Sequence, residues 1–94
     1  DHELFAMHVE THLGTKLVVF RGFTQAEGEA LVDTMSDTKN KSLTARKHVR
    51  KIIVHPALDA FDEYLSKRGG IATSVLGEAS AFYMGTRGDS AKKL

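Results

Sequence analysis

The start of the chain places hydrophobic side chains at helical spacing. Leu4 and Phe5 are followed, at intervals of four residues, by Val9 and Leu13, which is typical of a helix with one apolar face. Gly14 would end such a helix, because glycine commonly follows the last helical residue. We therefore predict an amphipathic helix over residues 2–13.

Residues 15–20 allow two assignments. The apolar run Leu17-Val18-Val19-Phe20 lies between Gly14 and Gly22. A short run bounded by glycines suits a buried strand, but hydrophobic periodicity cannot distinguish it from a short helix. Both assignments stay open at this point.

The next segment carries the clearest helix start. Thr24 is a good N-cap residue and Glu27 stands three positions later, so the two can form a capping box. Apolar side chains then line one side, at Ala26, Ala30, Leu31 and Met35. We predict a helix from Gln25 to about Thr38.

Three more helices are predicted in the rest of the chain. Ser42 or Thr44 can cap one that runs to Val54. Pro56 favours a break and a new helix, which Gly69-Gly70 ends. The last helix begins at Thr73 or Ser74 and ends at Gly85. Each of these three helices has an apolar stripe at helical spacing that we expect to be buried. The stripe is Ala45, Val49, Ile52 and Ile53 in the first helix, Leu58, Phe61 and Leu65 in the second, and Val75, Leu76, Ala79, Phe82 and Tyr83 in the third.

These elements together predict an all-α protein. The expected architecture is a compact bundle of four to five short helices, with residues 1–85 as a single helical domain and residues 86–94 as a frayed, polar basic tail. The alternative is an α+β fold with short strands at about 16–20 and 50–55, which could pair in parallel through a crossover connection.

Amino-acid composition indicates the class of protein and its cellular location, but it says little about function. The chain has 94 residues, and 41% of them are apolar, as in an ordinary globular domain. The absence of cysteine excludes disulfides and thiolate metal sites. No apolar run is long enough to span a bilayer, and no signal peptide is visible. We expect an intracellular protein without a membrane span, in a compartment that the sequence does not identify.

Charge is distributed very unevenly. The whole chain has a formal net charge of +1, whereas residues 39–55 carry +6 and contain no acid. The cations of this segment are Lys39, Lys41, Arg46, Lys47, Arg50 and Lys51. On a helix, Arg46, Lys47, Arg50 and Lys51 would lie together opposite the apolar stripe. Concentrated positive charge attracts polyanions and acidic proteins, so we predict that these six residues bind an anionic partner.

Other candidate chemistry is weaker. His8 and His12 would share a helix face and could supply two metal ligands, but exposed histidines are the simpler interpretation. Asp59, Asp62 and Glu63 would form an acidic cluster near His55, which we interpret as a solvated face. The chain has no nucleophile elbow and no phosphate-binding glycine motif. We therefore predict no catalytic residues, no cofactor and no metal.

The sequence thus predicts a protein that binds rather than catalyses. The favoured hypothesis is a small helical domain for protein–protein interaction, assembly or self-association that uses its basic face. The alternative is binding to the phosphate backbone of a nucleic acid through the basic helix at 39–55. A row of cations alone does not separate these two classes.

Overall fold

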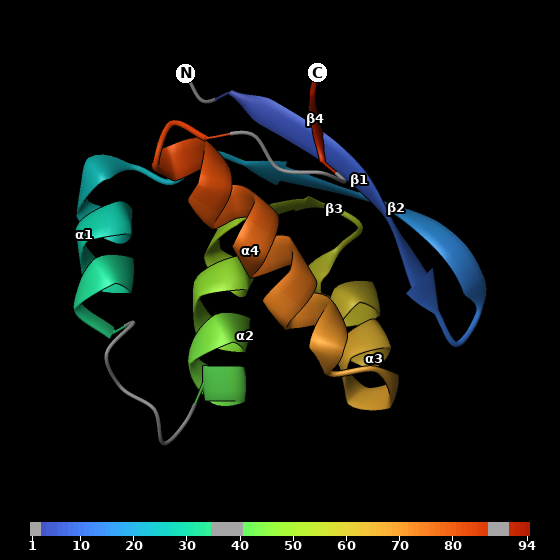
Figure 1. Ribbon diagram of the computed structural model, residues 1–94. Helices are drawn as coiled ribbons and strands as arrows, with labels where there is room; N and C mark the ends of the chain where they lie inside the picture. The colour runs from blue at the N-terminus through green and yellow to red at the C-terminus, as the bar shows by residue number, and fades with distance from the viewer. Residues whose placement is uncertain (1–2, 35–40, 87–90) are drawn as a thin grey trace.

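The computed structural model describes residues 3–34, 41–86 and 91–94. The elements in chain order are β1 (Leu4–Thr11), β2 (Gly14–Arg21), α1 (Gln25–Thr34), α2 (Lys41–Ile52), β3 (Ile53–His55), α3 (Leu58–Lys67), α4 (Gly70–Tyr83) and β4 (Lys92–Lys93). The strands form one sheet in the order β3-β2-β1-β4, and every neighbouring pair is antiparallel. Figure 1 shows α2, α3 and α4 on one side of this sheet.

The fold is therefore α+β, and the prediction of an all-α bundle of four to five helices is wrong. The alternative placed strands at about 16–20 and 50–55, and β2 and β3 lie there, although α2 continues through Ile52 before β3 begins. That alternative allowed for parallel pairing of the two strands, whereas β2 and β3 are antiparallel. It also did not include β1 or β4.

The largest error concerns residues 2–13, because the described part of this segment is strand β1 and not a helix. Phe5, Met7, Val9 and Thr11 are buried, whereas the residues between them are exposed or half-buried. This alternation has the two-residue period of a strand with one face on the core. Leu13, which suggested helical spacing, lies in the turn after β1 and is 59% exposed.

A tight turn joins β1 to β2. Thr11 pairs with Gly14 across the hairpin, and the Thr11 hydroxyl donates a hydrogen bond to the Gly14 carbonyl at 2.7 Å. The backbone N–H of Leu13 donates to the same hydroxyl oxygen at 3.1 Å. Gly14 has a φ of 102°, a conformation that favours glycine. The glycine expected to end a helix therefore closes a hairpin.

The helices agree with the sequence pattern in part. The capping box forms, because the Thr24 N–H donates to Glu27 Oε1 and the Glu27 N–H donates to Thr24 Oγ1. Helix α1 begins at Gln25 as predicted, and its expected end near Thr38 lies outside the described residues. Helix α3 begins at Leu58 rather than Pro56. Helix α4 begins at Gly70, earlier than Thr73 or Ser74.

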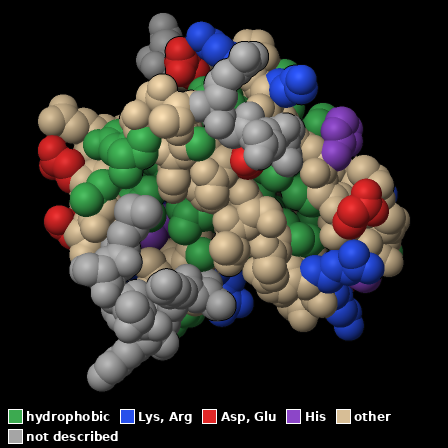
Figure 2. Space-filling view, viewed as in Figure 1, with side chains coloured by type: hydrophobic (Ala, Val, Ile, Leu, Met, Phe, Trp, Pro, Cys, Tyr) green, Lys and Arg blue, Asp and Glu red, His purple; other side chains and the backbone are tan. Residues whose placement is uncertain are grey.

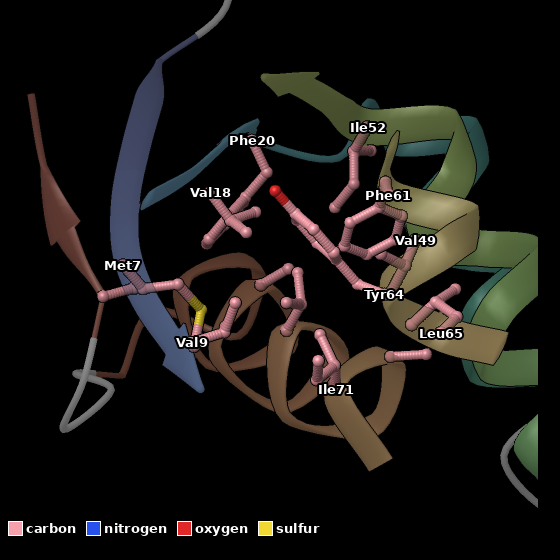
Figure 3. Packing of buried hydrophobic residues seen from close by; sticks show 14 of the residues in the cluster. Met7, Val9, Val18, Phe20, Val49, Ile52, Phe61, Tyr64, Leu65 and Ile71 are labelled. Carbon is pink, nitrogen blue, oxygen red and sulfur yellow. The ribbon is translucent and has the colours of Figure 1, made fainter. Parts of the chain in front are cut away.

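The core lies between the sheet and the helices (Figure 3). Side chains from β2, α2, α3 and α4 are fully buried there, namely Val18, Phe20, Val49, Ile52, Phe61 and Val75. Phe5 of β1 stacks on Phe82 of α4, with ring centroids 4.0 Å apart. The sheet thus supplies much of the apolar surface that the helices cover.

The C-terminal segment expected to be a tail contributes to the sheet. Lys92 and Lys93 of β4 pair with Ala6 and Phe5, and the Leu94 N–H donates to the Leu4 carbonyl at 2.8 Å. Ala91 is buried. Of the helices in the described part of the chain, none is both long and apolar enough to cross a membrane.

Candidate functional site

Helix α2 separates apolar from charged side chains. Ala45, His48, Val49 and Ile52 are buried and recur every three or four residues, so they form the face that packs on the core. The residues offset from this face are exposed: Leu43, Arg46, Lys47, Arg50 and Lys51. Ile53, expected on the same apolar stripe, instead begins β3 and is half-buried.

The exposed side chains of α2 line a groove that α3 completes. Its volume is about 820 Å³, and its lining residues are Leu43, Arg46, Lys47, Arg50, Lys51, Leu58 and Asp62. The structure thus brings Arg46, Lys47, Arg50 and Lys51 together. Lys41 is the first residue of α2, but its side chain is not among those described. Lys39 lies outside the described residues.

The arrangement of cations on α2 is unfavourable in isolation. Arg46 and Arg50 are four residues apart, as are Lys47 and Lys51, and α2 contains no acid. Like charges at this spacing destabilise a helix by about 0.2–0.5 kcal/mol per pair. Arg50 and Lys51 gain from the negative end of the helix dipole because they lie in the last turn. Arg46 and Lys47 lie earlier, so the dipole does not account for them.

One carboxylate from α3 partly offsets this charge. Asp62 Oδ1 accepts a hydrogen bond from Arg50 Nε at 3.0 Å, and the two side chains are 43% and 44% exposed. A pair this exposed contributes at most about 1 kcal/mol. Asp62 was expected on a solvated acidic face with Asp59 and Glu63. The sequence did not indicate that it faces α2, because that contact depends on how α3 packs.

Two leucines in the groove were not predicted as site residues. Leu43 is 57% exposed and Leu58 is 39% exposed, although Leu58 was expected in the core. Leu43 lies three, four and seven residues before Arg46, Lys47 and Arg50, so helical spacing alone could have placed it on the basic face. The groove therefore combines positive charge with exposed apolar surface.

A second ion pair anchors the C-terminal end of α2. The Arg21 guanidinium binds Glu27 through two hydrogen bonds of 2.7 Å, and its Nη2 also donates to the Lys51 carbonyl at 3.0 Å. Hydrogen bonds from Arg21, together with one from the Thr24 backbone, lower the pKa of Glu27 to about 2. Strand β2, the start of α1 and the end of α2 are thereby held together.

His48 lies behind the cations, on the buried face of α2. Burial lowers the pKa of His48, and the nearby positive charges of Lys51 and Lys47 lower it further. A neutral imidazole is therefore favoured at this position, and the exposed cations supply the positive charge of the helix.

The candidate metal ligands do not gather into a site. His8 is exposed on β1, and His12 lies in the hairpin turn, with its ring 6.3 Å from that of Tyr64. On a helix the two side chains would lie one turn apart, whereas four residues along a strand span about 13 Å, and His12 lies beyond the end of β1. In residues 3–34, 41–86 and 91–94, no group of three or more His, Asp or Glu side chains is placed to hold a metal ion.

The cations of the molecule are not all in the groove. Figure 2 shows the face on which α4 lies, where Lys and Arg side chains occur in small separate groups among acids and uncharged side chains. The α2–α3 groove is different because four cations and two leucines line one continuous surface.

Comparisons of the chain with models of protein families, with curated proteins and with solved structures found no match.

Proposed function

We propose that this protein is a non-enzymatic binding module that docks an acidic segment of a partner protein in the α2–α3 groove. The observation that carries the proposal is the lining of that groove, where Arg46, Lys47, Arg50 and Lys51 lie with Leu43 and Leu58. Acidic side chains would complement the four cations and relieve their mutual repulsion.

The leucines favour a protein over a nucleic acid. A phosphate backbone is recognised through cations and hydrogen-bond donors, and it offers little that would cover the exposed side chains of Leu43 and Leu58. A protein segment can place apolar groups there and gain about 25 cal/mol for each Å² removed from water.

The proposal is tested by binding of a fluorescent poly-glutamate peptide and of a duplex DNA with the same formal charge. We expect the peptide to bind at low salt. We also expect the triple variant Lys47→Ala, Arg50→Ala, Lys51→Ala to bind it about tenfold more weakly, because each exposed charge pair contributes up to about 1 kcal/mol. Circular dichroism should show an unchanged fold, since all three side chains are exposed.

A matched variant removes three cations elsewhere, through Lys16→Ala, Lys67→Ala and Lys92→Ala. These residues lie on β2, α3 and β4, and we expect peptide binding within about twofold of the parent because they do not line the groove. Equal losses in the two triple variants would show only a general charge effect. Tighter binding of DNA than of the peptide would favour the nucleic-acid alternative. The logarithm of the DNA binding constant should then fall with the logarithm of the salt concentration with a slope of about −3.6, for four phosphate contacts.

A further inference from the structure

The groove has a defined order of chemical groups along its length. Arg50 bonds to Asp62, and Arg46 lines a smaller cavity with Leu65. The earlier residue of α2, Arg46, thus lies near the later residue of α3, and the later residue of α2, Arg50, lies near the earlier one. The two helices therefore run in opposite directions along the groove. Leu43 is therefore at one end, Leu58 is at the other, and the cations lie between them.

We infer that the occupant of this groove is an amphipathic acidic helix, with carboxylates in its middle and leucine-sized side chains at both ends; this inference rests on the proposed function. The span from Leu43 to Lys51 is about 12 Å at 1.5 Å per residue, and cations four residues apart recur every 6 Å or so along it. A partner helix repeats carboxylates at the same interval when they are four residues apart.

An extended segment fits this groove less well. An extended peptide usually gains affinity from main-chain hydrogen bonds to the edge of a sheet. The residues that line this groove belong to α2 and α3, whose backbones bond within their own helices. A helical partner satisfies its own backbone and can lie along the surface between two helices.

Asp62 has a defined role in this arrangement. Among the described residues it is the one carboxylate that lines the groove, and it binds Arg50 through Nε. Asp62 thus occupies an anion position that a carboxylate of the partner would otherwise use. We expect the side chain to hold Arg50 in place and to weaken binding of an acidic partner at the same time.

The test uses a synthetic peptide of about 16 residues, long enough for four helical turns. The peptide carries leucines near both ends and two glutamates one turn apart between them, and a control peptide has glutamine in place of both glutamates. Binding is measured by calorimetry, and helix formation by circular dichroism of the mixture. The acidic peptide should bind and become helical, and the glutamine peptide should bind at least about tenfold more weakly.

Three variants of the protein separate the contributions. Leu43→Ser and Leu58→Ser should each weaken binding about three- to tenfold, because they remove apolar contact at one end of the groove. Asp62→Asn should strengthen binding about two- to fivefold, because it removes the competing charge. All three side chains are exposed or half-buried, and thermal unfolding checks that the variants fold.

The outcomes distinguish this inference from the proposed function. If the triple variant Lys47→Ala, Arg50→Ala, Lys51→Ala binds about tenfold more weakly, but neither leucine variant weakens binding and the peptide stays unstructured, the helical occupant is wrong. The proposal of an acidic partner then still holds. If the triple variant binds the acidic peptide as tightly as the parent, both proposals fail. Unchanged or weaker binding by Asp62→Asn would contradict the assigned role of Asp62.

Discussion

Glu27 is the residue with the most perturbed ionisation among the groups described. Its carboxylate accepts hydrogen bonds from Arg21 and from the Thr24 N–H, so the ionised form is strongly favoured and the pKa falls from an ordinary value of 4.5 to about 2. Because the folded-state pKa is the lower one, the pair stabilises the protein fully above pH 4.5. That contribution is lost as the pH falls towards 2.

We predict that Glu27→Gln lowers the free energy of unfolding by about 1–3 kcal/mol at pH 7, because it leaves the Arg21 charge without its carboxylate partner. The difference from the parent should shrink between pH 4.5 and 2 as Glu27 becomes protonated. Urea unfolding followed by circular dichroism measures both effects. Glu29→Gln is the matched control, because Glu29 is exposed and accepts a hydrogen bond from the exposed side chain of Gln25. A constant difference across this pH range would contradict the assignment.

The capping box could be predicted from the sequence, whereas the salt bridge could not. Thr24 and Glu27 are three residues apart, so their hydrogen bonds depend only on the local helix start. Arg21 reaches the Lys51 carbonyl across 30 positions of sequence. That contact exists only because β2 and the end of α2 lie side by side in the fold.

At the scale of elements, α1 is attached to the rest of the molecule by a close contact with the end of α4. Gly28 of α1 is buried, and a Cβ atom added there would overlap the ring of Tyr83. Phe23, just before α1, meets the same ring edge-on, with centroids 6.4 Å apart. The missing side chain of Gly28 therefore allows α1 and α4 to approach each other.

We predict that Gly28→Ala destabilises the protein by about 0.5–2 kcal/mol, because overlap with Tyr83 outweighs the gain of about 1 kcal/mol that alanine usually gives in a helix. In a Tyr83→Ala background the same substitution should be stabilising. Gly77→Ala in α4 is the control, since nothing lies within 4 Å of its added Cβ, and it should be neutral or stabilising. Urea unfolding of the parent, the two single variants and the double variant measures the coupling. Equal effects of Gly28→Ala in both backgrounds would show that Tyr83 is not the obstacle.

Among the elements, the hydrophobic pattern predicted α2 correctly and β1 wrongly. The predicted face of α2 formed because its apolar residues recur at helical spacing over three turns or so. In residues 4–13, Leu4, Phe5, Val9 and Leu13 matched helical spacing by coincidence, and Met7 was the residue that completed the strand pattern of β1. Short segments can satisfy both periods, and pairing with β2 decides between them.

At the scale of the whole molecule, the core depends on side chains that meet from several elements. Phe61 of α3 is fully buried and packs with Val18, Phe20 and Val49 in one cluster (Figure 3). A domain of this size buries roughly 60–65% of the surface that its unfolded chain exposes. A single large cavity can therefore remove much of its stability.

We predict that Phe61→Ala lowers the free energy of unfolding by about 3–5 kcal/mol, the usual cost of removing a buried aromatic ring. Leu13→Ala, in a residue that is 59% exposed, should change it by less than about 0.5 kcal/mol. Both are measured by urea unfolding. A loss at Leu13 comparable to that at Phe61 would contradict the hairpin turn and would agree with the helix first predicted for residues 2–13.

The sequence by itself determined the features that depend on neighbouring residues: the capping box at Thr24, the two faces of α2, the end of α3 before Gly69-Gly70 and the concentration of cations from Lys39 onwards. Tertiary structure decided the rest. It made residues 4–11 a strand, brought Asp62 and Leu58 to the basic face, and paired Lys92 and Lys93 with β1. The physical reason is the distance along the sequence over which each interaction acts. Helical periodicity and capping act within a few residues, whereas a sheet and an inter-helix groove form from segments that only the folded chain brings together.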